Sequence, residues 1–170
     1  MAKRPDFIFH WKDHLVEDVF SYPGSDEPLS YGAEFTSKIG LTRLGLGVDV
    51  IKPHQRCSWP HAHESEEEFV FILEGTPDIW VDGEIFRLAP GDCAGFPAGT
   101  GIAHTIINNT DTDVVFLVVG EREKMMNTRL HYPMHPARNA EIGDRHWKEM
   151  EGRPLGAHDG KPDALREREA

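Results

Sequence analysis

Alternating polar and apolar residues fill the middle of the chain and predict β-strands there. Over Leu44–Ile51, large aliphatic residues alternate with glycine and aspartate, with one exception at Ile51. A period of two residues is the pattern of a strand with one buried face. Glu68–Leu73 is almost continuously apolar after its first residue, which favours a strand that is buried along most of its length.

Turn signals separate these runs from further predicted strands. Asp82-Gly83 is a dipeptide favoured in two-residue hairpins, so a strand is expected on either side of it. Ala89–Asp92 and Asn108–Asp111 have the composition of two more turns. The remaining strands are expected at Asp78–Val81, Glu84–Leu88, Cys93–Phe96, Ala103–Ile107 and Asp113–Val119. Roughly seven short strands joined by tight turns favour an all-β sandwich or barrel.

The flanking segments are less regular, and we expect a single domain with two extensions. Residues 1–40 are the predicted N-terminal extension, in which Asp13–Phe20 has the pattern of one short helix. Residues 41–121 are the predicted barrel. Residues 122–170 are richer in charge, proline and glycine, so we expect a C-terminal extension that wraps the barrel or reaches a partner subunit. A frayed end is the alternative for its last residues.

Composition narrows the functional classes. The chain has 170 residues, 39% of them hydrophobic, which is enough for one packed core. Its formal charge of −11 disfavours phosphate backbones and anionic lipid heads, so we expect neither a nucleic-acid partner nor a membrane partner. Solubility alone also explains the acidity.

Targeting signals and cysteines point to a soluble cytoplasmic protein. No signal-peptide core follows the N-terminus, and the longest apolar run, Val114–Val119, is too short to span a bilayer. Cys57 and Cys93 do not make a disulfide framework. We expect Cys93, which lies in an apolar strand, to be a small buried residue.

The candidate chemistry lies around one His-x-His pair. Residues i and i+2 of a strand point to the same face, so His61 and His63 would direct two imidazoles into one space. Glu68 begins the next strand after a short acidic turn and can add a carboxylate. His104 lies on a later strand, behind a turn rich in proline and glycine. We expect these four side chains to bind one metal ion.

The spacing of these residues resembles the two sequence motifs of the cupins. The first motif, H-x-H-x(3,4)-E-x6-G, is matched by His61, His63, Glu68 and Gly75. The second motif, G-x5-P-x-G-x2-H-x3-N, is matched in order by Gly91, Pro97, Gly99, His104 and Asn108. The resemblance covers residues 55–108. It implies a single antiparallel β-barrel of the cupin type, which is jelly-roll-like, and it implies His61, His63, Glu68 and His104 as the full set of metal ligands.

Two positions depart from the cupin pattern. Gln55 stands where the first motif opens with glycine, so the turn there must avoid the positive φ that glycine permits. Four residues instead of two separate Gly99 from His104, although Gly101 restores the shorter spacing. Neither departure changes a predicted ligand. The runs PAGTGIAH and HDGKPDALR resemble small bacterial cupins described as sugar-phosphate isomerase-like.

Several other residues are assigned from their surroundings. Glu64, Glu66 and Glu67 flank the predicted carboxylate ligand, and we expect them to form a solvated turn. Glu67 and His54 are candidates for a proton-transfer base, and we expect His54 and His131 near a mouth of the barrel. Six aromatic residues are expected to pack the barrel: Trp59, Phe71, Trp80, Phe86, Phe96 and Phe116.

The ligand set suits one divalent transition metal, and it does not distinguish Mn, Fe, Ni, Co and Zn. We expect a metalloenzyme that polarises a carbonyl or chelates vicinal oxygens of a small-molecule substrate, as in aldose–ketose isomerisation. A metal-dependent dioxygenase and a non-catalytic sugar-binding barrel are the alternatives, since one fold hosts different functions. Exposed apolar strand edges invite association, and the resemblance to dimeric cupins predicts a homodimer.

Overall fold

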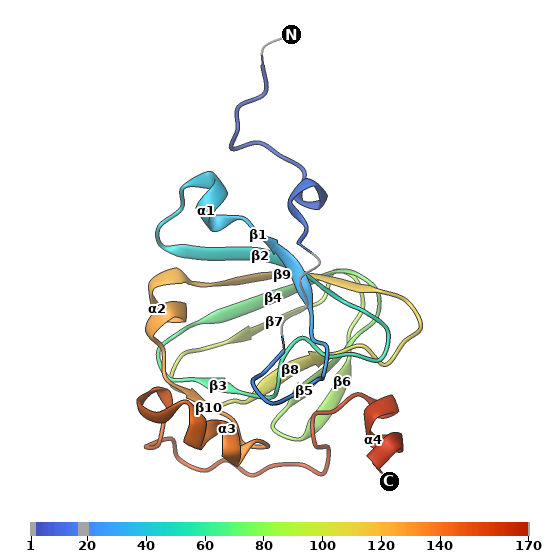
Figure 1. Ribbon diagram of the computed structural model, residues 1–170, viewed down its shortest axis with the longest axis vertical. Helices are drawn as coiled ribbons and strands as arrows, with labels where there is room; N and C mark the ends of the chain where they lie inside the picture. Colours follow the sequence, from blue (N-terminus) through green and yellow to red (C-terminus); the bar gives the residue numbers. More distant parts are fainter. Residues whose placement is uncertain (1–2, 17–20, 170) are drawn as a thin grey trace.

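Antiparallel strands make up most of the computed structural model, which describes residues 3–16 and 21–169 (Figure 1). One sheet has five strands in the order β1 (Tyr31–Glu34), β2 (Leu44–Ile51), β9 (Val114–Glu121), β4 (Glu68–Glu74) and β7 (Cys93–Phe96). A second sheet has the order β6 (Glu84–Arg87), β5 (Asp78–Val81) and β8 (His104–Ile107). A third pairs β10 (Leu130–His131) with β3 (Ala62–His63).

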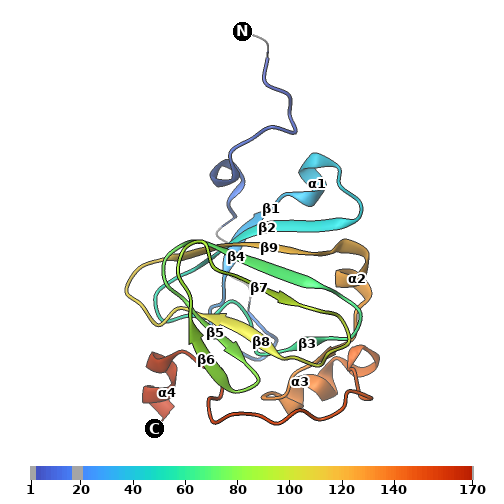
Figure 2. The same cartoon turned by 180° about the vertical axis from the view of Figure 1, so that it is seen from behind.

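The five-stranded sheet faces the two smaller sheets, and the core lies between them (Figure 2). Within the described residues, isolated β-bridges join the segment after β2 to strand β8 of the three-stranded sheet. They pair Arg56 with Ile107 and His61 with His104. The sheets therefore form a jelly-roll sandwich without one continuous closed ladder. This confirms the all-β, cupin-type fold expected from the sequence.

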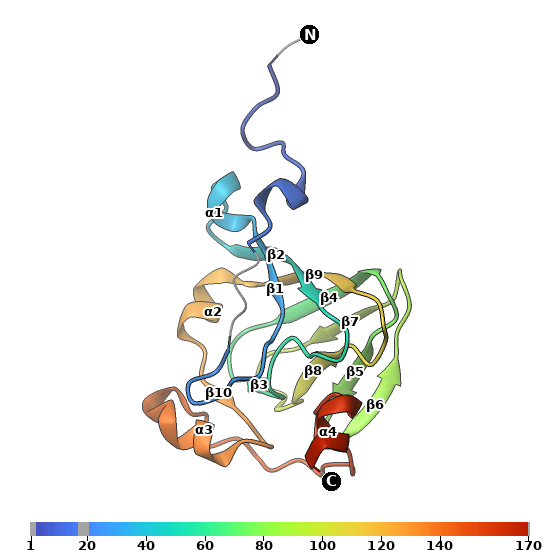
Figure 3. The same cartoon turned by 45° about the vertical axis from the view of Figure 1, so that its right-hand side comes forward.

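Short helices lie at the ends of the sandwich. They are η1 (Trp11–His14), α1 (Thr36–Ile39), α2 (Arg122–Asn127), α3 (Pro136–Glu141), η2 (Gly143–Arg145) and α4 (Asp163–Glu169). The segment from α3 to α4 runs beneath the two smaller sheets (Figure 3). It is tied there by hydrogen bonds such as that from Nε1 of Trp80 to the carbonyl oxygen of His158, 2.7 Å long. No helix among the described residues is long and apolar enough to cross a membrane.

Strand β2 separates two environments. Val48 and Val50 are buried on its outer side, where Trp11, Leu15 and Phe35 from the N-terminal segment cover them. The alternate residues of β2 are small or polar and line a cavity, as described below. The two valines of this alternating pattern therefore pack against the N-terminal segment, because that segment supplies the apolar partners.

Three local expectations were wrong. The helix at Asp13–Phe20 is replaced in the described part by η1, after which Val16 bridges Gly32; residues 17–20 lie outside the described residues. Packing of this segment onto β2 overrides its helical pattern. Cys93 is exposed because the alternation of β7 turns Phe96 inward and Cys93 outward. Phe86 is 54% exposed because β6 is an edge strand.

The other aromatic residues that were expected to pack the barrel differ in how deeply they are buried. Trp80, Phe96 and Phe116 are buried as predicted, whereas Phe71 and Trp59 are partly buried. On the outer side of the five-stranded sheet, Phe69 and Leu73 are each 38% exposed. The homodimer that would cover such a surface stays a prediction.

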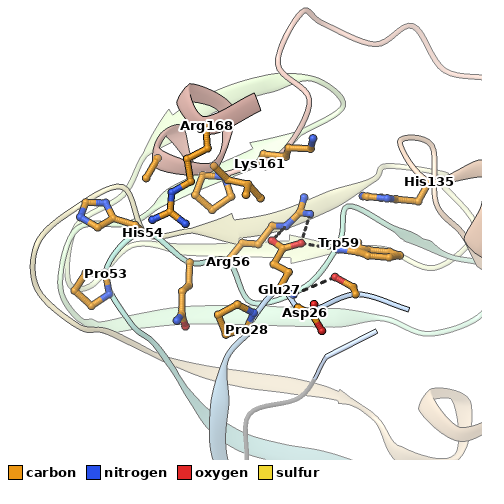
Figure 4. Close-up of a pocket in the computed structure, with 15 residues that line it drawn as sticks. Asp26, Glu27, Pro28, Pro53, His54, Arg56, Trp59, His135, Lys161 and Arg168 are labelled. Atoms are coloured by element: carbon orange, nitrogen blue, oxygen red, sulfur yellow. Dashed lines mark hydrogen bonds and ion pairs between the residues drawn. The ribbon is translucent and has the colours of Figure 1, made fainter. Parts of the chain in front are cut away.

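A buried arginine connects three distant parts of the chain (Figure 4). Arg56 is 1% exposed, and its Nε and Nη2 donate to the two carboxylate oxygens of Glu27 at 2.7 and 2.8 Å. Its Nη1 donates to the carbonyl oxygen of Gly160 at 2.7 Å. Nε1 of Trp59 donates to the same Glu27 carboxylate at 2.9 Å. The loop before β1, the segment after β2 and the C-terminal extension are thereby joined at one guanidinium.

We expect Glu27→Ala to lower the free energy of unfolding by about 3–5 kcal/mol, because it leaves the Arg56 guanidinium buried without its counter-charge. Burial raises the pKa of Glu27, but the hydrogen bonds and charge of Arg56 and the hydrogen bond from Trp59 together outweigh it, so the net pKa is below 4.5. The ion pair therefore stabilises the fold above that pH and is lost as the pH falls through the folded-state pKa.

Urea unfolding at pH 7 and pH 4 measures both effects. Glu27→Gln is the matched variant, since it keeps the side-chain size and should lose less stability at pH 7 while weakening the acid dependence. A loss below about 1 kcal/mol in Glu27→Ala would show that Arg56 does not depend on this carboxylate.

The β5–β6 hairpin makes a second contact with the C-terminal extension. Gly83 has φ +91°, and a Cβ added there would lie 2.3 Å from the backbone nitrogen of Gly156. Gly91 has a similar φ of +98°, with no atom within 4 Å of its added Cβ. We expect Gly91→Ala to cost only backbone strain, about 1–3 kcal/mol, and Gly83→Ala to cost clearly more in urea unfolding. Equal losses would show that the extension moves aside freely.

Candidate metal centre

Backbone pairing brings the His-x-His segment against β8. The amide of His61 donates to the carbonyl of His104 at 3.2 Å, and the amide of His104 donates back at 3.0 Å. His63 follows on β3, and Glu68 is the first residue of β4. Four positions from three separate parts of the sequence therefore meet at one end of the sandwich interior.

The side chains at these positions converge. One ring nitrogen each of His61, His63 and His104 lies within 4.8 Å of the others, so this group can hold a metal ion. Glu68 lies against two of the three: its Oε1 is 3.3 Å from Nε2 of His104, and its Oε2 is 3.6 Å from Nε2 of His63. We refer to these four residues as the His–Glu cluster.

Backbone carbonyls orient two of the imidazoles. Nδ1 of His61 is 2.8 Å from the carbonyl oxygen of Trp59, and Nδ1 of His104 is 3.3 Å from that of Ile102. A carbonyl only accepts, so Nδ1 of His61 carries the proton and its Nε2 keeps a lone pair. An Nδ1 held in this way is the usual outer contact of a histidine that binds metal through Nε2.

Glu66 lies behind His63, which corrects the expectation that it belongs to a solvated turn. Its side chain is 3% exposed, and its Oε2 is 2.9 Å from Nδ1 of His63, although the contact is not aligned as a hydrogen bond. Glu66 turns inward because Gly120 leaves room: a Cβ at Gly120 would lie 2.5 Å from Oε1 of Glu66. Of the other acids, Glu64 pairs with Arg129 and Glu67 is exposed.

The protonation states of the cluster suit a cation. Burial, and then the charges of His63 and His104, lower the pKa of His61 to about 3. Burial likewise lowers the pKa of His63 to about 4, against the charge of Glu68. Burial alone would raise the pKa of Glu68, but the hydrogen bond and charge of His104 lower it to about 2. Neutral imidazoles and an ionised carboxylate are the forms that bind metals.

The ring nitrogens of His63 bear on whether a metal ion fits this site. Among the described residues, neither ring nitrogen of His63 has a hydrogen-bond partner, although both are buried. Buried polar atoms are nearly always satisfied, so such a group needs an explanation. Its Nε2 faces the carboxylate of Glu68, as Nε2 of His104 does. Two imidazole nitrogens that face one carboxylate fit a cation between them.

A cavity of about 290 Å³ reaches Glu68 from the side of β1, β2 and β9. We call it the acidic cavity, since its lining includes the side chains of Glu34, Asp49, Glu66 and Glu68. Asp49 lies on β2 and accepts a hydrogen bond from Oγ of Ser30 at 2.9 Å. Burial raises the pKa of Asp49 to about 6 and that of Glu66 to about 8.

A larger cavity, of about 650 Å³, lies beside Arg56 and α4 (Figure 4). We call it the C-terminal cavity, because Lys161 and Arg168 belong to its lining. His54, a candidate base, also lines it, and its Nε2 is 3.3 Å from Oδ1 of Asp111. The structure therefore places His54 outside the acidic cavity.

Sequence reasoning did not single out Asp49 and Glu66 as lining a cavity, and the roles suggested for Glu67 and His131 stay predictions. Asp49 is the charged position in the alternation of β2, but a period of two residues does not tell which face lines a cavity. Glu66 was one of several glutamates with no signal of its own. Glu67 is exposed, and Nδ1 of His131 contacts Nε2 of His146 at 3.2 Å instead of joining the cluster.

The chain is similar to several known proteins. Residues 47–120 match the family described as Cupin domain. Over 50 residues the chain is 38% identical to polyketide synthase CurC of Streptomyces cyaneus, covering 29% of this chain and 32% of that protein. The match thus spans about a third of this curated relative.

Solved structures share the fold. A sugar phosphate isomerase of the cupin superfamily from Silicibacter pomeroyi is 29% identical, with a TM-score of 0.58, over 68% of this chain and 78% of that one. The polyketide cyclase RemF from Streptomyces resistomycificus is 22% identical, with a TM-score of 0.61, over 85% and 96% of the two chains. Fold, family match and motif residues agree, and residues 47–120 form a cupin domain.

Proposed function

We propose that the chain is a metalloenzyme that acts on a small polar substrate with a carbonyl or enediol group. His61, His63, Glu68 and His104 would together hold one divalent ion of Mn, Fe, Co, Ni or Zn. The observation that carries the proposal is the convergence of three imidazoles and one carboxylate next to a polar cavity. Mixed nitrogen and oxygen ligands suit these metals.

A divalent metal at this position supplies a Lewis acid that polarises a carbonyl or holds two neighbouring oxygens. The chain's own carboxyl groups would then move the proton. Asp49 and Glu66 both line the acidic cavity, and burial raises the pKa of each toward neutrality. A group with such a pKa can take a proton from one carbon and return it to the next.

Isomerisation of an aldose and a ketose is the reaction of this class that we favour. It needs a polarised carbonyl and one proton-transfer group, and the site offers both. The 29% identity to the Silicibacter pomeroyi sugar phosphate isomerase supports the reaction type. A metal-dependent dioxygenase and a sugar-binding protein without turnover are the alternatives that the experiments must separate.

We expect His61→Ala and His104→Ala to bind metal more than about a hundredfold more weakly than the unchanged protein, while the fold is kept. Loss of an outer hydrogen-bond partner alone costs ten- to hundredfold, and these variants lose a ligand. Elemental analysis and metal titration measure uptake, and circular dichroism checks folding.

His54→Ala is the matched control for metal uptake, since its imidazole lies in the C-terminal cavity. It should bind metal as the unchanged protein does. Full metal occupancy in either cluster variant would remove the basis of the proposed site.

The reaction is tested on protein purified without added metal. We expect about one transition-metal ion per chain and, in D₂O, deuterium incorporation at the carbon next to the carbonyl of a bound sugar, because proton transfer exchanges with solvent. NMR follows the exchange, and an oxygen electrode follows O₂. Consumption of O₂ with product formation would establish the dioxygenase instead, and tight sugar binding without exchange would establish the binding protein.

A further inference from the structure

We infer that the acidic cavity takes an uncharged polyhydroxy carbonyl compound, such as a free sugar, and rejects the phosphate esters of that compound. The inference rests on the proposed metalloenzyme function and names the substrate class of the same site. Its basis is the distribution of charge and hydrogen-bonding groups in the acidic cavity and the C-terminal cavity.

The lining of the acidic cavity carries four carboxyl groups and, among the described residues, no basic side chain. Glu34, Asp49, Glu66 and Glu68 belong to it, and none of its described lining residues is a lysine, arginine or histidine. The remaining lining residues are glycine, threonine or apolar. A metal held by the His–Glu cluster would be the one positive centre, at the end of the cavity that Glu68 occupies. A phosphate carried away from the chelated oxygens would meet carboxylates.

Hydrogen bonding leads to the same substrate class. Carboxylates accept hydrogen bonds, hydroxyl groups donate them, and phosphate oxygens accept them. A sugar hydroxyl therefore pairs with the carboxylate of Asp49, whereas a phosphate presents acceptors to that acceptor. The lining hydroxyl of Thr36 is already engaged, since it donates to the carbonyl of Leu44 at 3.1 Å and accepts from the amide of Leu46 at 2.8 Å.

Glycines on the strands shape the cavity for a small molecule. A Cβ at Gly32 would lie 2.7 Å from Oδ1 of Asp49, and one at Gly120 would lie 2.5 Å from Oε1 of Glu66. Both carboxyl groups can occupy their positions because these side chains are absent. The volume of about 290 Å³ lies at the lower end of the range for small-ligand sites.

Basic side chains gather elsewhere. Arg56, Lys161 and Arg168 line the C-terminal cavity, which shares no lining residue with the acidic cavity. Arg56 is already neutralised there by Glu27. The cations that recognise phosphate in proteins are thus not available to a ligand bound beside Glu68.

The test compares D-fructose with D-fructose 6-phosphate on the full chain loaded with Co²⁺. Changes in the visible absorption of the bound Co²⁺ report binding next to the metal, independently of turnover. We expect fructose to bind at least about tenfold more tightly than its phosphate, because the phosphate charge lies among carboxylates. Asp49→Asn should narrow this ratio severalfold, since it removes one negative charge and keeps the side-chain size.

Asp111→Asn is the control for net charge, because Asp111 is 97% exposed and lies outside the acidic cavity; it should leave the ratio unchanged. Equal or tighter binding of the phosphate, failure of both sugars to bind, or an unchanged ratio in Asp49→Asn would each overturn the inference while the metal site stands. A protein that takes up no Co²⁺ would overturn the proposed function and the inference with it.

Discussion

The two backbone hydrogen bonds between His61 and His104 are the contact on which the site depends. They join the segment after β2 to the first residue of β8, across a gap of more than forty positions in the sequence. With this pairing made, His63 follows on β3 and faces the carboxylate of Glu68. The histidines are positioned by backbone pairing, so their side chains can keep lone pairs directed at one point. Such preorganisation is what a metal site needs.

The two faces of β2 have different environments. Val48 and Val50 pack under Trp11, Leu15 and Phe35, so the outer side of the sheet has a small core of its own. The opposite side carries Gly45, Gly47 and Asp49 and borders the acidic cavity. Burying valines outside the sandwich leaves its inner wall free for small and polar residues. A strand at this place thus supports stability on one side and ligand binding on the other.

Acidic and basic side chains line different cavities, which the net charge of −11 does not reveal. Carboxyl groups gather beside the His–Glu cluster, where a cation would offset their mutual repulsion. Basic groups gather around the C-terminal extension, where Glu27 and Asp26 lie near them. The fold reaches this separation because residues 26–27, 54–56 and 161–168 meet only after the extension has wrapped the sandwich (Figure 3).

By itself, the sequence determined the strands and the positions of the candidate ligands. Period-two alternation, the Asp82-Gly83 turn and the spacing of His61, His63 and Glu68 are local signals, and each depends on neighbours within a few residues. His104 was found through its own short motif, which runs from Gly91 to Asn108. Only the tertiary structure decided which face of β2 is covered and which glutamate lies behind His63. Those outcomes depend on contacts between distant segments, such as Gly120 making room for Glu66, and no local pattern encodes them.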